Sequence, residues 1–582
     1  MNLKSTKPSL FSFNSDFGHD HVSNLYCLFG LAILMIFIGL GLRDPWPADE
    51  PRFAQIAMEM VHSGQWFFPS RGGELYPDKP PIFMWSIALF YWLTGSINIA
   101  FLLPSALSGL VTLYLVYSLG RKLWTNQIGF YAALLLIFSV QFTLQAKTAQ
   151  IDAMVCMWIT LGCYGLVRFL LIDGLWRWYY MAWFFMGIGV ITKGVGFLPL
   201  LMLLPFALLR GFKVQNCQTG APNIVGRWQW ALGPVVMLLA ICLWFLPMLL
   251  LVEHSQNPLF ETYRDNILFK QTVKRYADSW HHIKPFYYYV SSVIPVFWLP
   301  ISVLLPWLVV HWKRASKAGD YRIILPLVWI VLVIVFFSIS PGKRGVYILP
   351  ALPMLALISA PYLLAILKNK WPSRILWLLV GLLSLLMTFL AIAGWLEVKA
   401  SVKLVEQYQI EPWGFLATIG LAGLAVFVIT WWKKAQIKLL AWPLFIAVLW
   451  LVYSTWGYTL LGEVKTPKSV FAEMSQLIPD DAQLGLVDFS EQFILFSPYP
   501  ITHFGYHTDN DEQLKAAWQW QAEDAKNYIL INEALISQCF DSTQALDAGY
   551  AHRVHWVLLG PNSRLPQCDM PNEVVRQYHY SN

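Results

Sequence analysis

Carboxylates and a lysine gather in one polar stretch, residues 43–95, which directly follows the first long apolar segment. Its members Asp44, Asp49, Glu50, Asp78 and Lys79 lie next to apolar sequence, where an ionised side chain is costly and therefore usually serves a function. A carboxylate can orient or deprotonate an attacking hydroxyl, and an ammonium group can bind a phosphate. The stretch is therefore a candidate catalytic segment.

The same stretch contains the signals of a short helix. Asp49 or Glu50 can cap its start, Pro51 suits its first turn, and Ser63-Gly64 suits its end. One face of this helix would be apolar, formed by Phe53, Ile56, Ala57 and Met60. We therefore expect an amphipathic helix on the membrane surface. For Asp49, a role limited to helix capping is the alternative to a catalytic one.

The elements that must position these residues are membrane helices. The chain has 582 residues, of which 57% are hydrophobic and 13% charged, whereas soluble domains are roughly 45–50% apolar. Apolar runs occur near 24–42, 100–119, 128–146, 153–171, 179–191, 195–210, 231–252, 286–309, 323–338, 346–367, 375–395, 413–432 and 439–461. The sequence predicts a polytopic α-helical membrane protein with about 13 transmembrane helices.

The run at 80–94 is too short to span a bilayer, and loop charge indicates that it does not cross. If it does not cross, the basic clusters all fall on the side of the N-terminus, which the positive-inside rule makes cytoplasmic. These clusters are Arg121-Lys122, Arg177, Arg210/Lys213/Arg227, Lys313/Arg314/Lys317/Arg322, Lys368/Lys370/Arg374 and Lys433/Lys434/Lys438. The polar stretch and the C-terminal tail are then external, and the first apolar run is an uncleaved anchor.

This topology places charges of both signs at the outer membrane face. The cations are Lys79, Lys147, Lys193, Arg275, Lys343 and Arg344, and the acids are Asp49, Glu50, Asp78 and Asp152. Such a pocket suits an anionic lipid headgroup together with a reaction that requires carboxylates. Snorkelling of long side chains and ordinary ion pairing are the alternative explanation.

The outer loop at 253–285 ends in His281 and His282. With Asp278 nearby, these histidines could bind a divalent metal ion, although their spacing matches no metal-site pattern, and Asp78 is a further candidate ligand. The cofactor therefore stays open at this point.

Several strings resemble one family of enzymes, the polyprenyl-phosphate-sugar glycosyltransferases. They are RDPWPADEPRFAQIAMEMVHSGQW, GELYPDKPPIFMW, AKTAQIDAM, ITKGVGFLP, KQTVKRY with HHIKPFYYY, and SPGKRGVYILPALP. The resemblance is greatest to the lipid A aminoarabinose (4-amino-4-deoxy-L-arabinose) transferases and the protein O-mannosyltransferases. It implies a GT-C type fold and inverting transfer of a sugar from a polyprenyl (undecaprenyl) phosphate to a lipid A, glycan or protein acceptor at the outer face of the inner membrane.

The resemblance also implies site residues. The catalytic carboxylates correspond to Asp49, Glu50 and Asp152, and the lipid phosphate would be held by Lys79 and Arg275. Further substrate-binding candidates are Lys193, Lys343, Arg344, Arg52 and Tyr347. Asp78 stands where aminoarabinose transferases usually carry Glu, and the SPGKR turn also differs from theirs, so the sugar and the acceptor stay open.

The tail at 462–582 differs from the preceding transmembrane domain, residues 1–461, and predicts a small C-terminal periplasmic α/β domain. KSVFAEMSQLI is helical in pattern, whereas QLGLVDF, FILF, YILIN and VHWVLL read as strands. Cys539 and Cys568 are the two cysteines of this external domain, which predicts a disulfide. The domain would either contact the acceptor or cap the outer loops.

Other classes of membrane protein stay open. A polysaccharide ligase or polymerase would share a basic outer pocket. A transporter is disfavoured, because the chain shows no internal repeat and few ionisable residues at the centres of its apolar runs. No glycine pattern for a nucleotide precedes a parallel-sheet domain, which fits a lipid-linked donor, and no nucleic-acid partner is expected.

Overall fold

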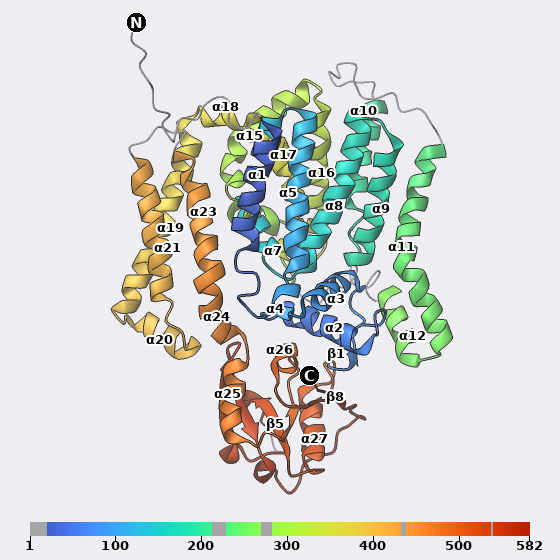
Figure 1. The fold of residues 1–582 in the computed structure, drawn as a ribbon, viewed down its shortest axis with the longest axis vertical. Helices are drawn as coiled ribbons and strands as arrows, with labels where there is room; N and C mark the ends of the chain where they lie inside the picture. The colour runs from blue at the N-terminus through green and yellow to red at the C-terminus, as the bar shows by residue number, and fades with distance from the viewer. Residues whose placement is uncertain (1–19, 212–227, 269–281, 432–437, 537–538, 582) are drawn as a thin grey trace.

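The chain folds into a bundle of helices with an α/β domain at one end, which begins at α25 (Lys468–Leu477) (Figure 1). The computed structural model describes residues 20–211, 228–268, 282–431, 438–536 and 539–581. The long helices of the bundle run roughly side by side between its two ends (Figure 1). A polytopic helical architecture with a small C-terminal sheet domain is therefore confirmed.

Helices occupy the apolar runs predicted from the sequence. The bundle helices are α1 (His21–Ala32), α5 (Leu103–Leu123), α6 (Asn126–Ile137), α7 (Val140–Ala146), α8 (Ile151–Val167), α9 (Trp176–Lys193), α10 (Leu203–Gly211), α11 (Trp228–Ser255), α15 (Ile301–Lys317), α16 (Tyr321–Ile339), α17 (Ala351–Ser359), α18 (Leu363–Leu367), α19 (Lys370–Trp395), α21 (Trp413–Trp431), α23 (Ala441–Val452) and α24 (Tyr458–Lys465).

The number of spans is less regular than the sequence pattern suggests. Within the described ranges, 7 helices are long and apolar enough to cross a membrane, or up to 9 if each of two bent pairs counts as one span. The α6–α7 pair bends by 72°, and the pair formed by Tyr289–Phe297 and α15 bends by 110°. Several predicted runs are thus broken or short helices, and the count of thirteen stays a prediction.

Close helix contacts hold the interior of the bundle together. α5 and α6 meet at Gly120 and Gly129, where a Cβ added to Gly129 would lie 2.4 Å from the carbonyl oxygen of Tyr117. Small residues at such crossings let two backbones approach closely, as is common in membrane bundles. α11, by contrast, exposes Leu239 and Leu243 on its outer face. Such a surface suits contact with lipid.

Helix α2 (Glu50–Ser63) has the bounds that the sequence predicts. Gly64 ends it with φ 70° and donates its N–H to the carbonyl of Met60. The expected apolar face is buried, but the helix does not lie free on a surface. It lies between the bundle and the C-terminal domain, packed against α3 (Ile82–Thr94) and α26 (Glu491–Phe496) (Figure 1). The position of α2 at the membrane surface stays a prediction.

The C-terminal domain is a six-stranded mixed sheet with the strand order β6-β7-β5-β3-β4-β8. The strands are β3 (Gln483–Leu486), β4 (Ile501–His503), β5 (Asn527–Asn532), β6 (Leu546–Ala551), β7 (Val554–Leu559) and β8 (Tyr578–Tyr580). Successive side chains of a strand point to opposite faces. Leu530 and Leu558 accordingly join one core with α25, whereas Ile529 and Val557 join another with α27 (Asn510–Gln521).

Three of the four predicted strands of this domain are present, and the fourth is a helix. QLGLVDF contains β3, YILIN lies in β5, and VHWVLL is β7. FILF, read as a strand, lies in α26, where Phe493 and Ile494 both face the core. A short apolar run has the same appearance in a buried helix and in a buried strand.

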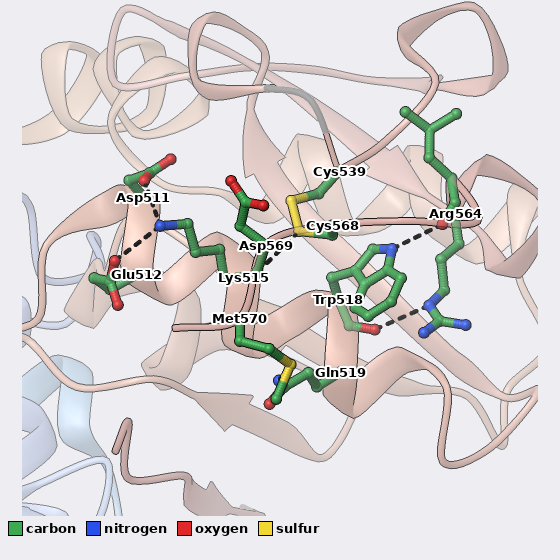
Figure 2. Close-up of a disulfide and its surroundings, with 11 residues drawn as sticks. Asp511, Glu512, Lys515, Trp518, Gln519, Cys539, Arg564, Cys568, Asp569 and Met570 are labelled. Carbon is green, nitrogen blue, oxygen red and sulfur yellow. Dashed lines mark hydrogen bonds and ion pairs between the residues drawn. A yellow bond between two sulfur atoms is a disulfide. The ribbon is translucent and has the colours of Figure 1, made fainter. Parts of the chain in front are cut away.

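A disulfide joins Cys539 and Cys568, whose Cα atoms are 4.8 Å apart (Figure 2). It closes a loop with a sequence separation of 29 residues. We expect the double substitution Cys539→Ser/Cys568→Ser to destabilise the domain by about 3 to 4 kcal/mol, because the cross-link restricts the unfolded chain. Thermal unfolding of the full-length variant in detergent checks this, and an unchanged melting temperature would contradict it.

Candidate functional site

Two carboxylates and two cations from separate parts of the chain form one cluster near the end of the bundle that carries the C-terminal domain. Asp49 Oδ2 accepts a hydrogen bond from Arg344 Nη2 at 3.2 Å. Asp152 Oδ1 pairs with Lys193 Nζ at 2.5 Å. The Lys193 ammonium lies 4.8 Å from the centre of the Tyr347 ring. The structure thus brings together five residues predicted from the sequence, and we call them the charged cluster.

Each member of the charged cluster lies at the end of a helix. Asp49 directly precedes α2, Asp152 is in the first turn of α8, and Lys193 is the last residue of α9. Arg344 and Tyr347 lie at the turn between α16 and α17. Because α8 packs along α9, Asp152 and Lys193 meet at adjacent helix ends. Helix ends at a membrane boundary can present charge without burying it in lipid.

Asp49 does not act as a helix cap. It occupies the position before the first residue of α2, but its side chain makes no capping hydrogen bond. Instead, its other oxygen lies 3.7 Å from Arg52 Nη1. The Asp49 side chain is 21% exposed, so an incoming hydroxyl group could reach it. The alternative of capping alone is therefore excluded for Asp49.

The carboxylates of the charged cluster also shift the pKa of its arginine, Arg344. Burial opposes the charge of Arg344, but Asp49 and Asp152 raise the pKa of its guanidinium above the ordinary value. Arg344 is 41% exposed, whereas its partner Asp49 is about half as exposed. A cation that remains charged and solvent-accessible at a membrane boundary is suited to bind a phosphate.

Glu50, the neighbour of Asp49, lies in a different environment. Its carboxylate accepts hydrogen bonds from Arg43 Nη1 at 2.5 Å and Nη2 at 2.7 Å, and both side chains are buried. The backbone N–H groups of Trp46 and Ala149 also donate to it, each at 2.9 Å. With both oxygens occupied, Glu50 anchors the surrounding backbone, and the catalytic role implied by the resemblance stays a prediction.

The Glu50 anchor ties together the two segments that carry the candidate catalytic carboxylates Asp49 and Asp152. One segment ends at Asp49, and the other runs from Lys147 through Ala149 to Asp152 at the start of α8. Arg43 adds a hydrogen bond from Nη2 to the Lys147 carbonyl at 3.2 Å. The buried Arg43–Glu50 pair therefore fixes the positions of Asp49 and Asp152 relative to each other.

We expect Glu50→Gln to destabilise the protein by about 3 to 5 kcal/mol, because it leaves the Arg43 guanidinium buried without its counter-charge. Enzymatic activity should fall together with thermal stability. The double variant Arg43→Met/Glu50→Met, which removes both charges, should regain much of the stability. A Glu50→Gln protein that is inactive yet as stable as wild type would indicate a direct catalytic role instead.

Lys343, a predicted substrate-binding residue, is bound to backbone carbonyls. Its ammonium group donates to the backbone carbonyls of Lys284 at 2.9 Å and Ser340 at 2.6 Å. The residue is 4% exposed, and burial lowers the pKa of its amine. Lys343 thus holds the turn that presents Arg344. Lys147 is similar, since it donates to the carbonyls of Ile36 and Ile38.

Arg52 connects the charged cluster to the C-terminal domain. Its Nε donates to Glu491 Oε1 at 2.6 Å, and Arg71 Nη1 donates to the same oxygen at 2.8 Å. Arg43, Arg71 and Glu491 were not singled out from the sequence. Arg43 directly follows an apolar run, which could have indicated it, whereas Glu491 carries no local signal.

For three predicted site positions, the structure gives little or no side-chain geometry. Arg275 and His281 lie outside the described residues. Lys79 precedes α3, and its carbonyl accepts from the Tyr263 hydroxyl at 3.5 Å. For the described part of the chain, which includes Asp78 and His282, no group of three or more His, Cys, Asp or Glu is placed to hold a metal ion.

Comparison with known proteins gives a consistent result. Residues 78–246 match the family described as dolichyl-phosphate-mannose-protein mannosyltransferase. The chain is 30% identical over 409 residues to the undecaprenyl phosphate-α-4-amino-4-deoxy-L-arabinose arabinosyl transferase of Pseudomonas savastanoi pv. phaseolicola, covering 69% of this chain and 70% of that protein. It is 32% identical over 347 residues to such a transferase of Pseudomonas fluorescens, covering 57% and 58%, respectively.

A solved structure shares the fold across nearly the whole chain. It is the crystal structure of ArnT from Cupriavidus metallidurans bound to undecaprenyl phosphate, with a TM-score of 0.66 and 19% sequence identity. The match covers 94% of this chain and 100% of that one. The similarity therefore includes both the helical bundle and the C-terminal domain.

Proposed function

Because this chain belongs to the family of undecaprenyl phosphate-α-4-amino-4-deoxy-L-arabinose arabinosyl transferases, we propose that it moves a sugar from undecaprenyl phosphate to lipid A. It is a multi-pass membrane glycosyltransferase with a GT-C type fold. The observation that carries the proposal is the charged cluster, in which Asp49 and Asp152 each contact a cation.

The cations of the cluster suit the leaving group of this reaction. When the glycosidic bond breaks, the lipid phosphate takes up negative charge, so a fixed cation binds the transition state more tightly than the ground state. Arg344 and Lys193 lie in the cluster, and Lys79 together with Arg275 is assigned to the same phosphate from the family resemblance. Tyr347 would lie beside the substrate, since its ring faces the Lys193 ammonium.

The carboxylates suit the acceptor side. Asp49 is exposed enough to accept a proton from an acceptor hydroxyl or to orient that hydroxyl for attack. Asp152 holds Lys193 and supports the cluster electrostatically. The acceptor oxygen forms the new bond to the anomeric carbon as the bond to the phosphate oxygen breaks. A single displacement of this kind inverts the configuration at that carbon.

The proposal includes the orientation of the protein in a bacterial inner membrane. α1 begins at the end of the bundle opposite the C-terminal domain (Figure 1). With the positive-inside rule, this arrangement makes the N-terminus cytoplasmic and the C-terminal domain periplasmic. Reporter fusions after Lys122 and after Asn582 should therefore give opposite locations. Two fusions on the same side would contradict the orientation.

Transfer by isolated membranes tests the function. Membranes that contain the wild-type protein should move label from radiolabelled undecaprenyl-phosphate aminoarabinose to lipid A, and membranes without the protein should not. Other undecaprenyl-phosphate sugars and glycan or protein acceptors, offered in parallel, identify the sugar and the acceptor. Absence of transfer from every such donor, with folded protein present, would contradict the proposal.

A further inference from the structure

The C-terminal domain contributes a buried carboxylate beside the charged cluster. Glu491 opens α26, and its side chain is 8% exposed. One of its oxygens accepts from Arg52 at 2.6 Å and from Arg71 at 2.8 Å. The two arginines come from the polar stretch after the first membrane helix, more than 400 positions away in the chain. Charge-assisted contacts of this length are among the strongest hydrogen bonds in proteins.

Arg71 gives Glu491 a fixed place. Its guanidinium stacks over the Tyr506 ring with 3.6 Å to the centroid, and the side chain is 2% exposed. The hairpin that carries Arg71, formed by β1 (Ser70–Arg71) and β2 (Glu74–Leu75), also bonds to the C-terminal domain, since His503 Nε2 pairs with the carbonyl of Gly72 at 2.8 Å. Of the two arginines that bind Glu491, Arg71 is therefore the one held in place by other contacts with the C-terminal domain.

Arg52 is the partner that faces the cluster. It is 20% exposed, and its Nη1 lies 3.7 Å from Asp49 Oδ1, farther than its Nε lies from Glu491. A guanidinium is planar and its N–H donors have a fixed geometry, so a bond through Nε determines where the Nη groups point. The hydrogen bond to Glu491 thus keeps Arg52 next to Asp49 but prevents these two side chains from forming a close ion pair.

We propose that Glu491 is a positioning residue of the active site, which keeps Arg52 from closing onto Asp49 and leaves both side chains available to the substrates. The C-terminal domain thereby completes the catalytic centre formed by the bundle. This inference rests on the proposed function for its kinetic consequence, but its geometric consequence is independent of what the enzyme transfers.

Without the Glu491 charge, Arg52 should rotate onto Asp49 and form a close ion pair with Oδ1, while Arg344 holds Oδ2. The carboxylate would then be unavailable to the acceptor. A misplacement of about 1 Å at a reacting group can reduce a rate on the order of 100-fold. We expect Glu491→Gln to reduce kcat by that order, with a smaller change in the KM for the lipid donor.

A double-mutant cycle separates positioning from simple domain stability. If Glu491 acts through Arg52, the variant Arg52→Ala/Glu491→Gln should be no slower than Arg52→Ala alone. If the losses in kcat of the two single variants multiply in the double variant, the proposal is overturned. A wild-type kcat for Glu491→Gln would overturn it as well. Glu512→Gln is the matched control, because Glu512 bonds to Lys515 in the same domain (Figure 2) and should leave kcat unchanged.

The geometric test is a structure of the Glu491→Gln variant in lipid nanodiscs. We expect Arg52 to have moved onto Asp49, and an Arg52 side chain in its wild-type place would overturn the proposal. If Glu491→Gln does not fold, Glu491→Asp replaces it in both tests, with the same displacement of Arg52 expected because the shorter side chain withdraws the acceptor. Wild-type protein that transfers no sugar would refute the proposed function, and the structure would still decide the role of Glu491.

Discussion

Asp49→Asn should abolish sugar transfer while donor binding stays close to that of wild type. The amide keeps the shape of the carboxylate but accepts no proton, and general base catalysis typically contributes about 10²- to 10⁴-fold to a rate. Removing a negative charge near the phosphate site also favours an anionic lipid slightly. Thermal shift with undecaprenyl phosphate measures binding, and transfer from the labelled donor measures turnover.

The matched control for this variant lies five residues earlier in the same segment. Asp44 pairs with Lys468 Nζ at 2.7 Å and with the amide of Asn98, and it has no described contact with the charged cluster. Asp44→Asn should therefore transfer at close to the wild-type rate. If Asp49→Asn loses lipid binding, or if it retains normal turnover, the role assigned to Asp49 is wrong.

Arg344→Ala should show the opposite pattern, with weakened donor binding as its first effect. Removing one cation from a partly desolvated phosphate site costs on the order of 2 to 4 kcal/mol in the transition state, or roughly 30- to 1000-fold in rate. Lys79→Ala should behave similarly if the family resemblance assigns it correctly. Arg344→Lys should rescue only part of the loss, since an ammonium cannot bind a phosphate in the planar, bidentate way of a guanidinium.

Lys284→Ala serves as the control for loss of positive charge. Lys284 is an exposed lysine of the same region, and only its backbone, through the carbonyl and the N–H group, contributes to the turn that carries Arg344. Its side chain can therefore be removed without removing that contact. Equal loss of donor binding in Lys284→Ala and Arg344→Ala would show that the effect is one of general charge and would contradict a specific phosphate site.

The charged cluster illustrates what the sequence can predict about a membrane enzyme. Asp49, Asp152, Lys193 and Arg344 all follow or precede apolar runs, and loop charge alone placed them at one membrane face. Their grouping at that face was thus accessible from the sequence. Glu50 was not distinguishable from Asp49, because its burial depends on Arg43 and on the backbone of Ala149, which is distant in the chain.

The C-terminal domain shows where local pattern fails. β5 and β7 can be predicted because each contains a short apolar run whose side chains enter the cores on both faces of the sheet. The segment FILF is likewise a short apolar run, but it forms a helix that packs against α2 and joins the same core as α25. The contact of Glu491 with Arg52 likewise depends on how the domain docks, which no local sequence feature encodes.

The most direct test of the central claim is the stoichiometry of a single turnover by the purified enzyme in nanodiscs. With undecaprenyl-phosphate aminoarabinose and lipid A, we predict that each sugar gained by the acceptor is matched by one undecaprenyl phosphate released, and that Asp49→Asn produces neither. Release of undecaprenyl phosphate without sugar on any acceptor, or equal transfer by the Asp49→Asn enzyme, would contradict the account.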